Sequence, residues 1–131
     1  MKIEKVLMKT KKADLTFYYS GKINITAHVT RALGLQAGDA VNIARVDKGW
    51  TEYYLYIERH ANDIMGRHDG TCTVTNGRCR NMRVFSCRLS RYILSLCHAD
   101  DKVALCIGKA EMVPEIGLAV PIIIHPLHIT K

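Results

Sequence analysis

The chain has 131 residues, of which 48% are apolar and 24% are charged. This composition is sufficient for a single domain over residues 1–131 with a hydrophobic core, and it excludes a wholly disordered chain. The longest apolar runs are far shorter than the roughly 20 residues that cross a bilayer, and the N-terminal segment lacks the apolar stretch of a signal peptide. Five cysteines in such a chain are expected to be reduced thiols. We therefore expect a cytoplasmic domain that does not enter a membrane.

The basic residues are concentrated in two separated segments. The chain carries 19 Lys and Arg against 12 Asp and Glu, a net charge of +7. Residues 1–31 and 67–98 each have a net charge of +5, whereas residues 32–66 and 99–131 have −2 and −1. If the fold brings the two basic segments to one face, a polyanion could bind there. The alternative is an exposed basic surface that has no partner.

The first half of the chain begins with a predicted hairpin. Residues 15–19 are rich in β-forming types, Ser20-Gly21 is a turn signal, and residues 22–25 alternate polar and apolar. Thr26 follows at the position of a helix N-cap, where its hydroxyl is expected to accept a hydrogen bond from a free backbone N–H. The pattern therefore predicts a hairpin that leads directly into a helix.

That helix is expected to be short, with one apolar face and two strands after it. Gly34 and Gly38 can end the helix and turn the chain. The two strands are expected at residues 40–46 and 52–58, around a turn at Asp47-Lys48-Gly49. The apolar face of the helix is made by residues at helical spacing: Val29, Ala32 and Leu33.

The second half repeats this order. A strand at residues 71–75, a turn at Asn76-Gly77 and a returning strand at residues 78–85 predict a second hairpin. Ser86 then stands at an N-cap position. The closing strands are expected at residues 103–107 and 118–124, with Pro114 in their connection. The helix between takes its apolar face from four residues: Leu89, Tyr92, Ile93 and Leu96.

The two halves read as a duplicated unit in the order ββαββ, at about residues 13–60 and 69–127. Val29-Thr30-Arg31 corresponds to Leu89-Ser90-Arg91, and Asp39-Ala40-Val41 to Asp101-Lys102-Val103. The offset between matched positions is 60 to 62 residues, so small insertions are needed.

Two stretches, Gly21-Lys22-Ile23-Asn24-Ile25 and residues 32–43 (ALGLQAGDAVNI), resemble the AbrB/MazE/MraZ family of swapped-hairpin transcription factors. The resemblance implies a mainly β fold with short helices, in which two intertwined ββαββ swapped-hairpin units form one barrel-like pseudo-dimer. It implies DNA as the partner and transcription regulation as the role, with no cofactor, and further assembly of pseudo-dimers into homo-oligomers is open. The chain departs from the family at Lys22, where Arg is usual, and at Thr26, where Pro is usual.

In that family, the DNA-facing surface is built from the turn of the first hairpin and the start of the helix, once in each unit. Arginine can bind a phosphate or a guanine edge with two hydrogen bonds. Lysines near the N-terminus could add contacts that are blind to sequence. For the helix residues, the alternative is a solvent-facing side. The predicted nucleic-acid-binding residues are Lys11, Lys12, Lys22, Arg31, Arg78, Arg80, Arg83, Arg88 and Arg91.

No convincing catalytic or metal site emerges from the sequence. A zinc site from His68, Cys72, Cys79 and another Cys or His has poor spacing. Cys97-His98 beside Asp100-Asp101 only superficially resembles a nucleophile with its base. We therefore expect a protein that is not an enzyme and holds no metal.

The alternative function is a protein-interaction module, antitoxin-like or an adaptor, in which the same basic face meets an acidic protein. Trp50 lies beside Gly49 at the tip of a predicted hairpin. An exposed tryptophan at that tip would mark a protein-contact patch.

Overall fold

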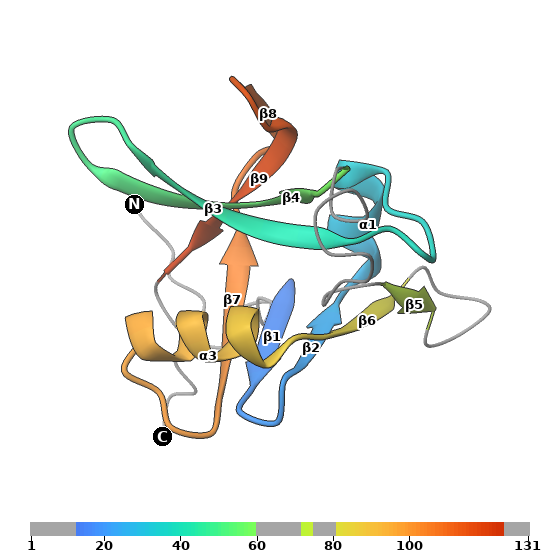
Figure 1. Cartoon of the computed structure of the whole chain (residues 1–131), viewed down its shortest axis with the longest axis vertical. Helices are drawn as coiled ribbons and strands as arrows, with labels where there is room; N and C mark the ends of the chain where they lie inside the picture. Colours follow the sequence, from blue (N-terminus) through green and yellow to red (C-terminus); the bar gives the residue numbers. More distant parts are fainter. Residues whose placement is uncertain (1–12, 60–71, 75–80, 125–131) are drawn as a thin grey trace, which may run out of the picture.

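The computed structural model describes residues 13–59, 72–74 and 81–124. This part of the chain is mainly β, with two short helices (Figure 1). The elements in the first half are β1 (Leu15–Tyr18), β2 (Lys22–Ile25), α1 (Ala27–Leu33), β3 (Val41–Asp47) and β4 (Thr51–Ile57). Those in the second half are β5 (Thr73–Val74), β6 (Met82–Phe85), α3 (Cys87–Leu96), β7 (Lys102–Ile107), β8 (Glu111–Val113) and β9 (Gly117–Ile123).

The strands form one curled antiparallel sheet in the order β3-β4-β9-β7-β1-β2-β6-β5, with β8 paired to β9. The sheet curls into a half-barrel, and strand β7 connects its β3-β4-β9 part to its β1-β2-β6-β5 part. The first residues of β7 pair with β1, and its last two residues pair with β9. Figure 1 shows the β3–β4 hairpin crossing one end of the molecule and α3 lying at the other end, beside β1 and β2. The prediction of a mainly β fold with short helices is confirmed at this level.

Three ladders join strands from the two halves of the sequence. Strand β1 pairs with β7, β2 pairs with β6, and β4 pairs with β9. Neither half therefore completes the sheet with its own strands alone.

The core lies inside the curl of the sheet and is built by alternation along the strands. Leu15 and Phe17 of β1 and Ile23 of β2 are almost completely buried, while their neighbours in the strand are partly exposed. Helix α3 adds Ile93 and Leu94. Burial of each such side chain contributes about 1.5–3 kcal/mol, so this alternation fixes which face of the sheet turns inward.

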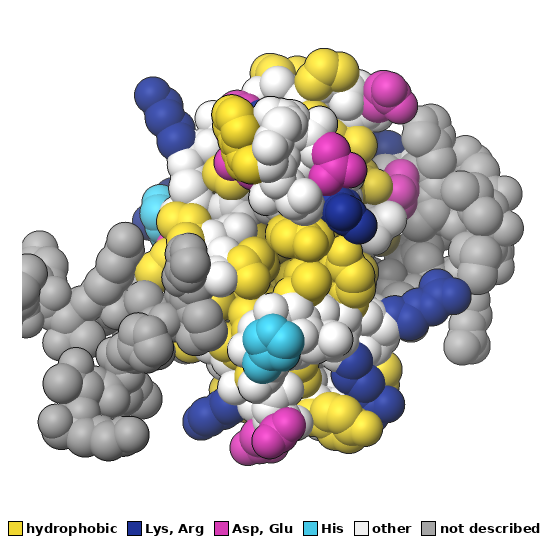
Figure 2. All heavy atoms as spheres, turned by 90° about the vertical axis from the view of Figure 1, so that its left-hand side faces the viewer, with side chains coloured by type: hydrophobic (Ala, Val, Ile, Leu, Met, Phe, Trp, Pro, Cys, Tyr) yellow, Lys and Arg dark blue, Asp and Glu magenta, His cyan; other side chains and the backbone are white. Residues whose placement is uncertain are grey.

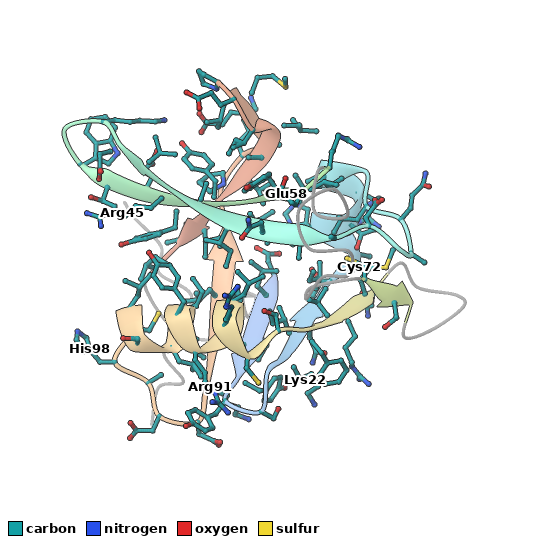
Figure 3. The ribbon with its side chains drawn as sticks, in the orientation of Figure 1. Lys22, Arg45, Glu58, Cys72, Arg91 and His98 are labelled. Carbon is teal, nitrogen blue, oxygen red and sulfur yellow. The ribbon has the colours of Figure 1, made fainter. Side chains whose placement is uncertain are left out.

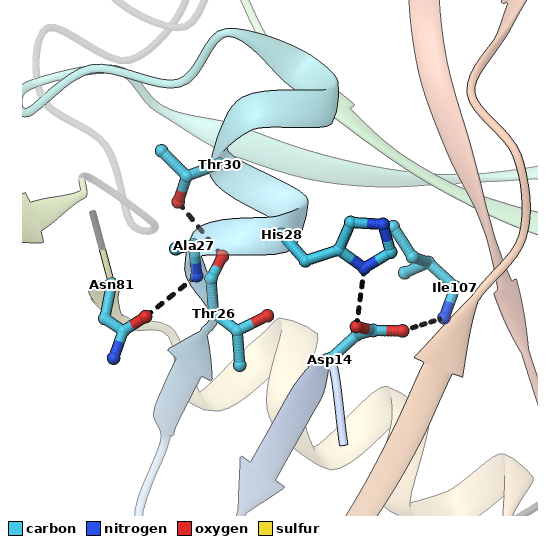
Figure 4. Close-up of polar contacts among 7 residues, drawn as sticks. All are labelled: Asp14, Thr26, Ala27, His28, Thr30, Asn81 and Ile107. Carbon is cyan, nitrogen blue, oxygen red and sulfur yellow. Dashed lines mark hydrogen bonds and ion pairs between the residues drawn. The ribbon is translucent and has the colours of Figure 1, made fainter. Parts of the chain in front are cut away.

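Both helices begin where a β strand ends, but they are capped differently. The Ser86 hydroxyl accepts a hydrogen bond from the backbone N–H of Leu89 at 3.2 Å, as the sequence predicts. Thr26 is the N-cap residue of α1, as predicted, but the hydrogen bond predicted for its hydroxyl is absent, because its side chain makes no capping bond. The amide of Ala27 instead donates to Asn81 Oδ1 at 2.8 Å, so the cap of α1 comes from the second half of the chain (Figure 4).

Helix α1 is also fixed to the sheet through Asp14 (Figure 4). One carboxylate oxygen of Asp14 lies 2.9 Å from His28 Nδ1, and the other accepts a hydrogen bond from the Ile107 amide at 2.9 Å. These contacts connect the start of β1, the first turn of α1 and the end of β7. The sequence pattern indicates no structural role for Asp14 or Asn81.

The remaining predictions of the elements differ from the structure in detail. Helix α1 ends at Gly34, which adopts the left-handed conformation as expected. Tyr92 was expected on the buried face of α3 but is 41% exposed, and its ring meets that of Tyr53 edge-on at 6.0 Å. Strand β8 was not predicted, since only Val113 of its three residues is buried. The predicted strand residues 78–80 lie outside the described part of the chain.

Neither of the two described helices is long and apolar enough to cross a membrane.

Candidate nucleic-acid interface

The face of the sheet that points away from the core is the candidate interface, and we call it the outer face. Side chains that are directly opposite in an antiparallel ladder point to the same side, so the strand registers define this face. None of its nine residues is acidic. They are Lys102 and Ala104 of β7, Thr16 and Tyr18 of β1, Lys22 and Asn24 of β2, Arg83 and Phe85 of β6, and Thr73 of β5.

One row of the outer face combines cations with aromatic rings. Tyr18 lies opposite Lys102, and Lys22 lies opposite Phe85. The Lys22 ammonium is 4.3 Å from the centroid of the Tyr18 ring, within the range of a cation–π interaction. Phe85 is 59% exposed, which is unusual for a phenylalanine and leaves its ring free to meet a ligand.

The next row surrounds a hollow of about 270 Å³ at the point where β2 leads into α1. Across this row Thr16 lies opposite Asn24, and Asn24 lies opposite Arg83. Three buried polar atoms of the hollow have no hydrogen-bond partner within the described structure: Asn24 Oδ1, Thr26 Oγ1 and Arg83 Nε. Buried polar groups are almost always paired with protein, water or a ligand, so these three atoms make the hollow a place where a hydrogen-bonding group can be held.

The start of α3 packs against the β1–β2 turn, below the outer face. The Arg91 guanidinium donates from Nε to the backbone oxygen of Tyr19 at 3.0 Å and lies 4.0 Å from the centroid of the Tyr19 ring. Ser90 donates its hydroxyl proton to the backbone oxygen of Tyr18. Arg91 therefore has a structural contact on one side, while Arg88 on the same helix is exposed.

The structure brings together some of the predicted binding residues and separates others. Lys22 and Arg83 share the outer face, and Figure 3 places Lys22 and Arg91 at the same end of the molecule, beside the β1–β2 turn. Arg31 belongs to the last turn of α1, the end of the helix that leads to β3, and does not join this group. Four predicted residues lie outside the described residues: Lys11, Lys12, Arg78 and Arg80.

The side of the molecule shown in Figure 2 carries charges of both signs. In the coloured part of Figure 2, an apolar band crosses the middle, and Lys and Arg side chains are spread around its rim with Asp and Glu between them. This side presents no continuous cationic surface. The described residues as a whole include ten Lys and Arg and nine Asp and Glu, so their arrangement matters more than their number.

The groups considered for chemistry do not assemble into a centre within the described residues. No three His, Cys, Asp or Glu side chains of this part of the chain lie close enough to hold a metal ion. Burial, followed by the charge of Asp39, raises the pKa of Cys72 to about 11, and burial also raises the pKa of Cys97. Both thiols therefore stay protonated near neutral pH and are poor nucleophiles. His68 and Cys79 lie outside the described residues.

The tip of the β3–β4 hairpin carries an ionic cluster and an exposed tryptophan. Lys48 Nζ lies 2.7 Å from the Tyr54 hydroxyl and 3.2 Å from Glu52 Oε1, and these partners raise the pKa of Lys48. Trp50 is 64% exposed. Its exposure agrees with the condition set for a protein-contact patch, but the Lys48 charge beside it is already paired with Glu52 and Glu111.

No family model, no curated protein and no solved structure matches this chain. The case for a function therefore depends on the residues and their geometry.

Proposed function

We propose that the chain is a tandem of two interlocked ββαββ units, as the resemblance to swapped-hairpin transcription factors implies. The register of the β2–β6 ladder supports this. Lys22 pairs with Phe85 and Ile25 pairs with Met82, and a shift of 60 residues converts each of these pairs into the other. A pseudo-two-fold axis between the units would pass through this ladder, and the same offset relates the matched stretches of sequence.

We further propose that the protein binds DNA through the outer face and the adjoining start of α3. The observation that carries this proposal is the β2–β6 ladder, which brings Lys22 of the first basic segment and Arg83 of the second onto one surface. Asp14, the carboxylate that precedes β1, is engaged with His28 and the Ile107 amide. A polyanion that approaches the outer face therefore meets cations and polar groups without an opposing free carboxylate among its nine residues.

The chemistry of the face is suited to nucleic acid. Ammonium and guanidinium groups bind phosphates and release counterions, which supplies affinity without sequence selectivity. Exposed rings add contacts with bases. By the sequence resemblance, the role of such binding is transcription regulation.

The experiment is a binding titration with labelled DNA of mixed sequence, followed by fluorescence anisotropy. A variant with Lys22→Gln and Arg88→Gln is compared with one with Arg31→Gln and Arg45→Gln, because both lose two positive charges. Arg45 lies on the β3–β4 hairpin, far from Lys22 in Figure 3. We expect only the first pair to weaken binding strongly and to lower the salt slope by about 2.

Equal losses in the two variants would mean that binding follows net charge and not this face. The runner-up function, a module that binds an acidic protein, predicts no measurable binding to DNA in the same titration. The first variant would then lose the protein partner instead.

A further inference from the structure

The hollow beside Arg83 is the part of the outer face that phosphate binding does not explain. Its three unpartnered atoms differ in chemistry: Arg83 Nε is a donor, Asn24 Oδ1 is an acceptor, and Thr26 Oγ1 can be either. All the oxygens of a DNA phosphodiester, including the two charged non-bridging ones, only accept hydrogen bonds. A phosphate would therefore satisfy Arg83 but would leave Asn24 Oδ1 unpaired and facing an anion.

A nucleobase edge offers the complementary pattern. The Watson–Crick edge of every base carries an acceptor next to an N–H donor, which matches the donor of Arg83 and the acceptor of Asn24 on adjacent strands. In a duplex this edge is already used for pairing. The three atoms are buried and belong to residues that line the hollow, so a group must protrude to reach them, and an unpaired base does so.

The surroundings of the hollow supply surfaces on which bases can stack. Phe85 follows Arg83 by two residues on β6, so both side chains point to the same side about 7 Å apart. Tyr18 has the same relation to Thr16 on β1. Aromatic rings beside a basic groove are the usual means of holding single-stranded nucleic acid.

We propose that the hollow formed by Asn24, Thr26 and Arg83 recognises an unpaired nucleobase, with Phe85 as the stacking ring for its neighbour. This inference rests on the proposed binding of DNA by the outer face and narrows it to single-stranded DNA. The base enters edge-first, accepts from Arg83 Nε and donates to Asn24 Oδ1.

The test compares three labelled probes at one salt concentration: a single strand of mixed sequence, the same strand annealed to its complement, and an abasic strand of equal length. Phe85→Ala removes the ring, and Arg83→Lys keeps the charge but removes the Nε donor. We expect the wild type to bind the single strand tightest, and each variant to bind it about tenfold more weakly with little change for the other two probes.

Two further variants keep the result interpretable. Phe85→Tyr should restore binding of the single strand, because it retains a ring. Met112→Ala removes another exposed apolar side chain, 72% exposed on β8, and should change nothing. Thermal unfolding of each variant checks that the fold is kept.

Each other outcome overturns the inference in a recognisable way. If the wild type binds the abasic strand as tightly as the mixed-sequence strand, the face reads phosphates only, and the hollow holds water; the proposed DNA binding then survives. If the duplex binds tightest and the two variants leave it unchanged, the hollow takes no part in binding. If no probe binds, the inference and the proposed function fall together.

Discussion

At the scale of single residues, the docking of α3 on the β1–β2 turn depends on a glycine. Gly21 has a φ of +102°, and a Cβ at this position would lie 2.9 Å from Cys87 Sγ. Its carbonyl accepts from the Ser86 amide at 2.9 Å, so the turn and the start of α3 are joined by backbone. A side chain here would be strained and would also push the helix away.

We therefore expect Gly21→Ala to destabilise the protein more than Gly49→Ala. Gly49 also has a positive φ, +85°, but a Cβ there would meet open space. The conformational cost alone is about 1–2 kcal/mol, and the clash with Cys87 adds to it only at Gly21. The free energy of unfolding from denaturant titration measures both, and equal values would contradict the steric argument.

The cysteines should differ in reactivity for a reason visible at the same scale. Cys72 is buried and its pKa is raised to about 11, whereas Cys87 is exposed. A raised pKa leaves less thiolate at lower pH, so iodoacetamide at about pH 8 should modify Cys87 first. Modification of Cys72 should accelerate as the pH rises toward 11.

Peptide mass spectrometry of samples quenched in time measures the two rates. Unfolding in denaturant is the control, because it should make them similar. Equally fast modification of Cys72 and Cys87 in the folded protein at about pH 8 would contradict the burial of Cys72.

At the scale of the elements, local sequence predicts most strands and both described helices, but not the contacts between them. Ser20-Gly21 and Gly34 mark a turn and a helix end that depend only on neighbouring residues. The cap of α1 does not, because Asn81 is 54 residues from Ala27 and reaches it only when β6 pairs with β2. Strand β8 escapes prediction since its pairing with β9, and not an alternation of its own, defines it.

The caps give a prediction that reverses the expectation from the sequence. Asn81→Ala should cost about 1 kcal/mol of stability, as loss of a helix N-cap usually does. Thr26→Val should cost little or nothing, because the Thr26 hydroxyl is buried without a partner and its loss leaves no bond broken. Asn81→Asp keeps the accepting oxygen and should retain most of the stability in the same unfolding titration. A larger loss from Thr26→Val than from Asn81→Ala would contradict this assignment.

At the scale of the whole molecule, the charge pattern predicts that the two basic segments lie on one face. The structure brings only some of their residues together. Lys22 and Arg83 meet on the outer face, whereas Arg31 does not join them. Register is the reason: the pairing of β2 with β6 decides which residues share a face, and a shift by one residue would turn Arg83 toward the core. Composition and local pattern do not determine that register.

The chain's net charge lies mostly outside the described residues. These residues contribute a net charge of +1, and the remaining segments contribute the other +6 of the total +7. Contacts of the N-terminal lysines with phosphates and stacking of a base on Phe85 should differ in their response to salt. Counterion release makes the binding constant fall with salt for each phosphate contact, whereas stacking of a base on Phe85 releases no counterions.

Replacement of Lys9, Lys11 and Lys12 by Gln should accordingly lower the salt slope of binding to single-stranded DNA by up to about 2, at roughly 0.7 for each contact. Phe85→Ala should weaken binding at every salt concentration and leave the slope unchanged. Anisotropy titrations over a series of salt concentrations measure both effects. A slope that is unchanged in the lysine variant would show that these lysines do not contact phosphates, and a reduced slope in Phe85→Ala would show that the loss of the ring displaces the strand from the cations of the outer face.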